Sequence, residues 1–160
     1  MNKKTAISLQ SSVNPDPFVF SAEQRLEWAR RRIRRGSVCR WWEAAFNKPK
    51  FAVILNVHCP PEPAVIFAFT TSDRQGFYKN NKRVQNDIVI IPAKKYGCFP
   101  LETVINLREV RPRDFTSMCT TRDFHIEEDL DENDLGLINT VLRNSELIAV
   151  DFLKLILPES

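Results

Sequence analysis

The sequence predicts an α+β fold: a small, strongly curved antiparallel sheet or β-barrel, with helices toward both ends of the chain. Two observations predict the sheet. Short runs rich in β-branched and aromatic residues recur through the middle of the chain, and turn residues separate them at close intervals. A third observation predicts the last helix, because apolar residues recur every three or four positions from residue 131 onward.

Length and composition favour one domain with an added arm. The chain has 160 residues, of which 43% are hydrophobic and 27% charged, as in ordinary folded proteins. Four widely spaced cysteines indicate reduced thiols and a cytoplasmic protein, and no apolar run is long enough to cross a membrane. We expect three segments: a flexible leader at 1–20, a basic helical arm at 21–35, and the sheet domain with its C-terminal helix at 36–160.

The arm is predicted to be a helix with one arginine-rich face. Ser21 and Gln24 form a capping box, and Gly36 offers a left-handed stop. Guanidinium groups on that face would suit phosphates, which they contact in bidentate fashion. The alternative is a solvated basic face, or one paired with the acidic run 127–134. The candidate phosphate ligands are Arg30, Arg31, Arg34 and Arg35.

Strands are predicted at 37–42, 51–57, 64–69, 87–91 and 103–110, the last ending at Arg111-Pro112. The second and third flank a proline-rich corner at 59–63, so we expect them to pair antiparallel. The start of one strand then lies beside the end of the other. Cations and hydroxyls would meet at that rim of the sheet, namely Lys48 and Lys50 with Thr70, Thr71 and Ser72.

Two further features suit single-stranded nucleic acid, whose bases stack on aromatic rings and whose phosphates pair with cations. One is the polar loop 73–83, with candidates Arg74, Tyr78, Lys79, Lys82 and Arg83. The other is Trp41, because Trp41 and Trp42 point to opposite faces of an extended strand and one of them would lie exposed. The alternatives are a hairpin whose aromatics pack on the sheet, and core or dimer packing for the tryptophans.

Residues 113–130 are predicted to be irregular, with a short helix near 113–118. Acidic residues then begin a helix at residue 131, and Asn144-Ser145 interrupts it before a second apolar stretch that runs to Pro158. The two histidines, His58 and His125, lack further ligands at metal-binding spacing, and the four glycines form no nucleotide-binding pattern. We therefore expect no metal and no cofactor.

The order of these features resembles the MazF/PemK-like (Kid-like) toxin family of bacterial toxin–antitoxin systems. The resemblance runs from about Arg35 to Leu157, and no single motif carries it. It rests on an Arg-Gly turn, four strands and a leucine-rich helix, in this order: Arg35-Gly36-Ser37-Val38, 51–56, 68–72 with its closing hydroxyls, 87–91, 102–107 and 130–142. Ser37 stands where the family usually has an acidic residue.

The resemblance implies an SH3-like barrel, a homodimer, a cognate antitoxin partner and metal-independent cleavage of single-stranded messenger RNA, the work of a hydrolase. In this family an arginine that begins the second strand and a hydroxyl after the third strand carry much of the chemistry. The arginine's place falls on a lysine here, Lys50 by register or Lys48 by the basic-Pro dipeptide, and the hydroxyl is Thr70, with Thr71 and Ser72 beside it. The alternative is a non-catalytic barrel that binds nucleic acid or protein as a regulator or adaptor.

Overall fold

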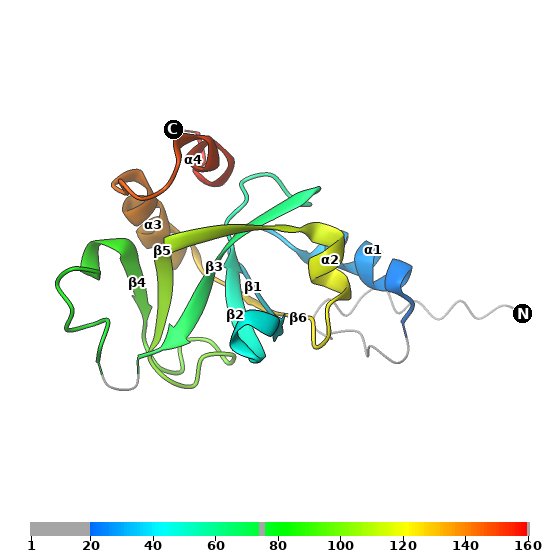
Figure 1. Ribbon diagram of the computed structural model, residues 1–160, viewed down its shortest axis with the longest axis horizontal. Helices are drawn as coiled ribbons and strands as arrows, with labels where there is room; N and C mark the ends of the chain where they lie inside the picture. The colour runs from blue at the N-terminus through cyan, green and yellow to red at the C-terminus, as the bar shows by residue number, and fades with distance from the viewer. Residues whose placement is uncertain (1–19, 74–75, 160) are drawn as a thin grey trace, which may run out of the picture.

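The computed structural model describes residues 20–73 and 76–159, so nearly all of the expected leader and Arg74 lie outside the described residues. Figure 1 shows the arrangement of the helices and strands. The strands are β1 Ser37–Glu43, β2 Lys48–Ile54, β3 Ala64–Ser72, β4 Ile88–Ile91, β5 Thr103–Asp114 and β6 His125–Asp129. The helices are α1 Ala22–Arg32, α2 Phe115–Thr120, α3 Glu132–Arg143 and α4 Val150–Ile156, with 3₁₀ turns at Ala44–Phe46 and Gln85–Asp87.

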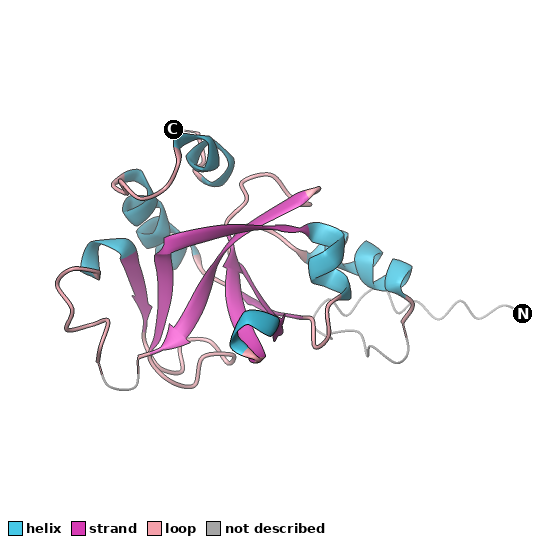
Figure 2. Cartoon of the chain, in the orientation of Figure 1, coloured by secondary structure: helices cyan, strands magenta, loops and turns pink. Residues whose placement is uncertain are grey.

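The described strands form one antiparallel sheet in the order β4-β5-β3-β2-β1-β6. The sheet curls into an open half-barrel, as Figure 2 shows, with β4 and β6 as its two edges. The α+β class and the curved antiparallel sheet are therefore confirmed. No helix within the two described stretches is both long and apolar enough to cross a bilayer.

Both faces of the central strands are buried, and this explains why the part of β2 that follows Lys50 is apolar without interruption. Side chains alternate between the two faces. Val53 and Leu55 pack into one core with α3 and α4, whereas Ala52 and Ile54 pack into a second core with α1 and α2. The helices thus cover opposite faces of the sheet (Figure 1).

The N-terminal helix is present, but it is shorter than expected. Its capping box is formed, with Ser21 Oγ accepting from Gln24 N–H and Gln24 accepting from Ser21 N–H. The helix ends at Arg32, before Gly36. Gly36, with φ +86°, belongs to the turn that enters β1, and a Cβ there would stand 2.9 Å from Leu135. The glycine is needed for that turn and is not the stop of the helix.

Strand β5 is longer than predicted, because it continues through Arg111-Pro112 to Asp114. Pro112 lies opposite Ile66 of β3. On its other side β5 pairs with β4 only as far as Asn106, so its second half has no described neighbour there. A proline is tolerated at such a position because its missing N–H costs no ladder bond on the open side.

The second difference is β6, which lies in a stretch expected to be irregular. His125–Asp129 pairs antiparallel with β1. Three of its five residues are acidic and only Ile126 is buried, so the stretch lacks the apolar alternation that predicts a strand. The short helix α2 begins within the predicted region, and α3 and α4 are separated at residues 144–149 as the sequence indicates.

Candidate functional site

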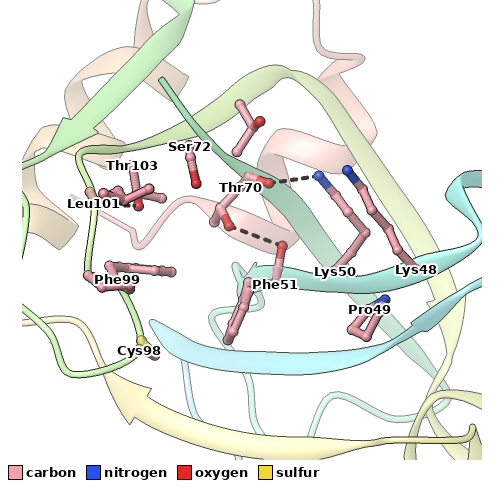
Figure 3. A pocket seen from close by; sticks show the side chains of 12 residues that line it. Lys48, Pro49, Lys50, Phe51, Thr70, Ser72, Cys98, Phe99, Leu101 and Thr103 are labelled. Atoms are coloured by element: carbon pink, nitrogen blue, oxygen red, sulfur yellow. Dashed lines mark hydrogen bonds between the residues drawn. The ribbon is translucent and has the colours of Figure 1, made fainter. Parts of the chain in front are cut away.

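The candidate site lies where β2 and β3 part. Their ladder runs from Ile54↔Phe67 to Ala52↔Phe69 and goes no further. Beyond it two side chains bridge the strands: Lys50 Nζ donates to Thr70 O at 2.9 Å, and Thr70 Oγ1 donates to Phe51 O at 3.3 Å (Figure 3). Side-chain bonds therefore replace backbone pairing and leave space between the strand ends.

The neighbouring strand is irregular at the same level. Ala68 of β3 pairs with Val110 of β5 and Thr70 pairs with Ile105, so residues 106–109 of β5 lie opposite Phe69 alone. Such bulges bend a strand and re-aim its side chains. Two residues of the bulge, Asn106 and Glu109, line a hollow together with Lys50 and Thr70 at the parted ends of β2 and β3.

A cleft of about 520 Å³ opens at this point. All five residues predicted to be catalytic line it, together with a wall from residues 98–103. The amino ends of Lys48 and Lys50 lie side by side in Figure 3, across from Ser72 and the wall residue Thr103. The expected meeting of cations and hydroxyls at one rim is therefore present; Lys48, Lys50, Thr70, Thr71 and Ser72 line the same space.

The wall of the cleft is tied to α3 by a buried tyrosine. Tyr96 Oη donates to Asp134 at 2.6 Å and accepts from Asp131 N–H at 2.8 Å. Burial raises the pKa of Tyr96 to about 12, so it stays a protonated donor. Lys95 adds an ion pair with Asp134 at 2.7 Å, and the Tyr96 ring packs edge-on against Phe99 of the wall.

A second hollow, of about 270 Å³, adjoins the first. The two share Lys48, Lys50, Thr70 and Thr71, so these residues form the ridge between them. The lining of the second hollow is aromatic and polar, and it comes from the 3₁₀ turn, β3, the loop after β3, and β5: Phe46, Phe69, Tyr78, Asn106, Glu109 and Arg111.

The Lys50 ammonium is partly desolvated and has no acidic partner. Burial first, and then repulsion from Lys48, lower its pKa. Its Nζ lies 5.1 Å from the centre of the Phe46 ring and 5.7 Å from that of Phe69, close enough for cation–π attraction. Across the described chain neither cleft lysine forms an ion pair with a carboxylate. Their charge is therefore available to an anion.

The three hydroxyls differ in access. Thr70 is only 5% exposed and its hydroxyl is engaged with Phe51 O, so it holds the strand ends in place. Thr71 is half-buried and Ser72 is exposed, and both line the cleft. Of the predicted hydroxyls, Thr71 and Ser72 are the ones that a ligand could reach without displacing an existing hydrogen bond in the site.

The loop after β3 contributes one aromatic ring to the site. Asp73 is buried and accepts from the backbone N–H groups of Tyr78 and Lys79, at 3.2 and 2.9 Å, which fixes the loop. Tyr78 packs partly against a small cluster that includes Val84, yet it still lines the second hollow. Phe77 is 64% exposed and makes an edge contact with Tyr78.

The other described RNA-ligand candidates of this loop do not line either hollow. Lys79 forms an ion pair with Glu102 at 3.6 Å, and Lys82 and Arg83 are exposed. Arg74 falls outside the described residues. Among the loop candidates that the structure describes, only Tyr78 lines a hollow together with the cleft lysines.

The prediction that Trp41 stacks a base is wrong. Trp41 is fully buried in the second core, where its ring meets Phe67 edge-on at 5.0 Å and its Nε1–H donates to Glu43. The helices α1 and α2 cover that face of the sheet, so the side chain that faces it is enclosed. Trp42 is the half-exposed member of the pair and lies 4.7 Å from the Arg122 guanidinium.

The arginines of the arm are largely engaged within the protein. Arg32 and Arg34 both pair with Asp129 of β6, which bears out the alternative that the arm pairs with the acidic run. Arg35 donates to the carbonyl of Ile156 and to the Asn139 side chain, and thereby ties down α4. The other two candidates also have carboxylate partners: Arg30 pairs with Glu62 and Arg31 with Glu27.

Five residues that line the second hollow were not predicted as site residues, and one of them, Phe69, lies inside the predicted strand 64–69. Phe46 lies in a 3₁₀ turn, and Asn106, Glu109 and Arg111 lie at or next to the bulge of β5. Strand patterns predict which residues alternate, but they do not locate a bulge. In the described residues no group of three or more His, Cys, Asp or Glu side chains is placed to hold a metal ion.

Neither a protein-family model nor a curated protein matches this sequence. The function is therefore inferred from the geometry of the cleft.

Proposed function

We propose that this protein is a metal-independent endoribonuclease that cuts single-stranded RNA in the cleft between β2 and β3, on an SH3-like barrel of the MazF/PemK-like kind. One observation supports the proposal above the others. Two lysines without acidic partners and a group of hydroxyls line one cleft at the parted ends of neighbouring strands.

The residue types suit attack by a ribose 2′-hydroxyl on the adjacent phosphorus. The proton of that hydroxyl must leave, the bond to the 5′-oxygen breaks, and that oxygen takes up a proton. In this proposal Lys48 and Lys50 bind the phosphate and stabilise the negative charge that grows on its oxygens. Thr71 and Ser72 relay protons, while Thr70 positions the strand ends through its bond to Phe51 O.

The partners of the proposed enzyme follow from the resemblance alone. They are a second copy of the chain in a homodimer and a cognate antitoxin protein, with the reaction taking place in the cytoplasm. An antitoxin that silences the enzyme would cover the two hollows and carry acidic side chains toward Lys48 and Lys50, since those ammonium groups have no carboxylate of their own.

Incubation of the purified full-length chain with end-labelled single-stranded RNA in excess EDTA tests the proposal. Cleavage is expected, and Lys50→Ala should slow it by about 100-fold or more, the usual cost of losing a group that stabilises transition-state charge. Lys154→Ala, an exposed lysine on α4 away from the cleft, is the matched control and should cut normally. Intact RNA with the wild-type chain, or full activity in Lys50→Ala, would refute the proposal.

A second candidate function is single-strand binding without cleavage. It is favoured by the hydrogen bonds already made in the cleft, because Lys50 donates to Thr70 O and the Thr70 hydroxyl is occupied. The same assay separates the two candidates. A binding protein would leave the RNA whole and hold it with an affinity that falls as salt rises and falls further in Lys48→Ala.

A further inference from the structure

The second hollow has a different chemistry from the ridge of lysines beside it. Glu109 and Arg111 form an ion pair at 2.6 Å on β5, so their charges cancel. Both side chains remain accessible, at 64% and 43% exposure. An anion that entered this hollow would meet the Glu109 carboxylate, whereas at its edge Lys48 and Lys50 form no ion pair with a carboxylate of the described residues. The hollow therefore favours a neutral polar group, with a phosphate held at the ridge.

The wall of the hollow presents both donors and acceptors. Asn106 Oδ1 accepts from Arg108 N–H at 3.1 Å, which orients the carboxamide and leaves its NH₂ group without a hydrogen-bond partner among the described residues. The Arg111 guanidinium lies 5.6 Å from the centre of the Phe69 ring, which also lines the hollow. Cation–π attraction keeps the guanidinium close to that ring. The Glu109 carboxylate supplies acceptors alongside these N–H groups.

Tyr78 adds a face for stacking. Asp73 fixes the backbone of the loop at Tyr78, and the ring packs against its own small cluster, so little freedom remains to be lost on binding. A planar ligand could lie against this ring with its edge toward β5. At about 270 Å³ the hollow is near the lower end of small-molecule sites, which suits a single base.

We propose that this hollow is a guanine subsite of the RNA cleft, and this inference rests on the proposed function. Guanine presents two neighbouring donors, N1–H and N2–H₂, which a carboxylate such as Glu109 can accept together. It presents acceptors at O6 and N7, which suit the Arg111 fork and the Asn106 amide. Adenine has a donor in place of O6 and no N1–H, so it would leave these groups unpaired.

The test measures binding rather than cleavage. Fluorescence anisotropy would compare 2′-fluoro oligouridine, which lacks the attacking hydroxyl, with the same oligomer carrying one guanine, inosine or adenine. We expect guanine to tighten binding by about tenfold or more over adenine, the scale of one good bidentate contact. Inosine lacks N2–H₂ and should fall between the two.

Substitutions test which residues are responsible for the preference for guanine. Glu109→Gln should remove most of the difference between guanine and inosine, since the amide no longer accepts at both positions. Arg108→Gln changes an exposed residue of the same bulge that does not line the hollow, and it should keep the preference. Circular dichroism confirms that each variant is folded.

The outcomes separate this inference from the function on which it rests. Equal affinity for all the oligomers, or a guanine preference that survives in both Glu109→Gln and Asn106→Ala, overturns the subsite while cleavage of ordinary RNA leaves the proposed function intact. A wild-type chain that neither binds nor cuts single-stranded RNA overturns both.

Discussion

The chain has two basic regions, and they differ in what their charges face. In the arm, Arg31 pairs with Glu27 one helical turn away and Arg34 pairs with Asp129 of β6. In the cleft, the ammonium of Lys50 faces a second lysine, a carbonyl and two aromatic rings. The arm holds more cations, but most of its arginines pair with carboxylates and Arg35 donates to a carbonyl and an amide, whereas Lys48 and Lys50 form no ion pair among the described residues.

This difference shows why the density of basic residues is a poor guide to an anion site. An arginine run is conspicuous in a sequence, but its carboxylate partners can come from anywhere in the chain, and here one of them lies on β6. An anion is attracted most strongly where folding has left positive charge uncompensated. The comparison predicts that changes in the arm alter stability, whereas changes in the cleft alter binding and titration.

The largest effect is expected for Asp129→Ala. This carboxylate accepts from Arg32, Arg34 and Ser37, and the Arg32 side chain is only 16% exposed. Its removal leaves a largely buried guanidinium uncompensated and should lower the free energy of unfolding by about 3 kcal/mol. Urea denaturation measures it, with the exposed Glu132→Ala as control. A loss no larger than that of the control would show that the arm is not held by its ion pairs.

The next effect is a shift in the titration of Lys50. Lys48→Ala removes one of the two causes that lower its pKa, so that pKa should rise toward the ordinary 10.5, while burial keeps it somewhat below. NMR of ¹³C-methylated lysines follows the titration, and Lys154→Ala should leave it unchanged. An unmoved Lys50 signal would mean that the two ammonium groups do not interact.

The sign of the related pH effect on stability follows from the same shift. The unfolded chain binds the Lys50 proton more tightly than the folded chain does. This residue's contribution to stability therefore rises as the pH increases through the interval between the lowered pKa and 10.5. Lys48→Ala should narrow that interval, which urea denaturation at several alkaline pH values would show.

The smallest effect is expected for Arg31→Ala. Its side chain is 75% exposed and its partner Glu27 lies on the same helix. Exposed pairs of this kind contribute about 0.5 kcal/mol or less. The affinity for single-stranded RNA should also stay the same, measured by anisotropy at low and moderate salt. A marked loss of affinity would show that the arm binds phosphate in spite of its ion pairs, and that arm and cleft do not differ in this respect.

Much of the fold follows from the sequence because its strongest signals are local. The runs at 51–57 and 64–69 are apolar because both faces of the central strands are buried. In α3 the apolar residues recur every three or four positions because only one face of the helix packs against the core. The edge strand β6 gave no such signal, since its side chains mostly face solvent or ion pairs. The prediction for Trp41 failed because the sequence does not show which face of strand β1 is covered by the helices α1 and α2.

The part of the site that depends on the pairing of β2 with β3 could be predicted from the sequence. Antiparallel pairing of β2 with β3 brings Lys50 beside Thr70, and the sequence indicates that much. The second hollow depends on the bulge of β5 opposite Phe69, which is a tertiary feature without a sequence period. Asn106, Glu109 and Arg111 therefore became candidates only once the chain was folded.

The open sheet has a consequence for how molecules of this protein meet one another. An open half-barrel has an edge strand at each margin of its sheet. The unpaired N–H and C=O groups of an exposed edge strand can pair with a strand of a neighbouring molecule and start a fibre. The margin formed by β6 carries Glu127, Glu128 and Asp129 in succession. Glu127 and Asp129 are held in ion pairs by Arg40, Arg32 and Arg34, so a neighbouring backbone that approached this strand would crowd charged side chains. The acidity that hid this strand in the sequence therefore also discourages self-association along it.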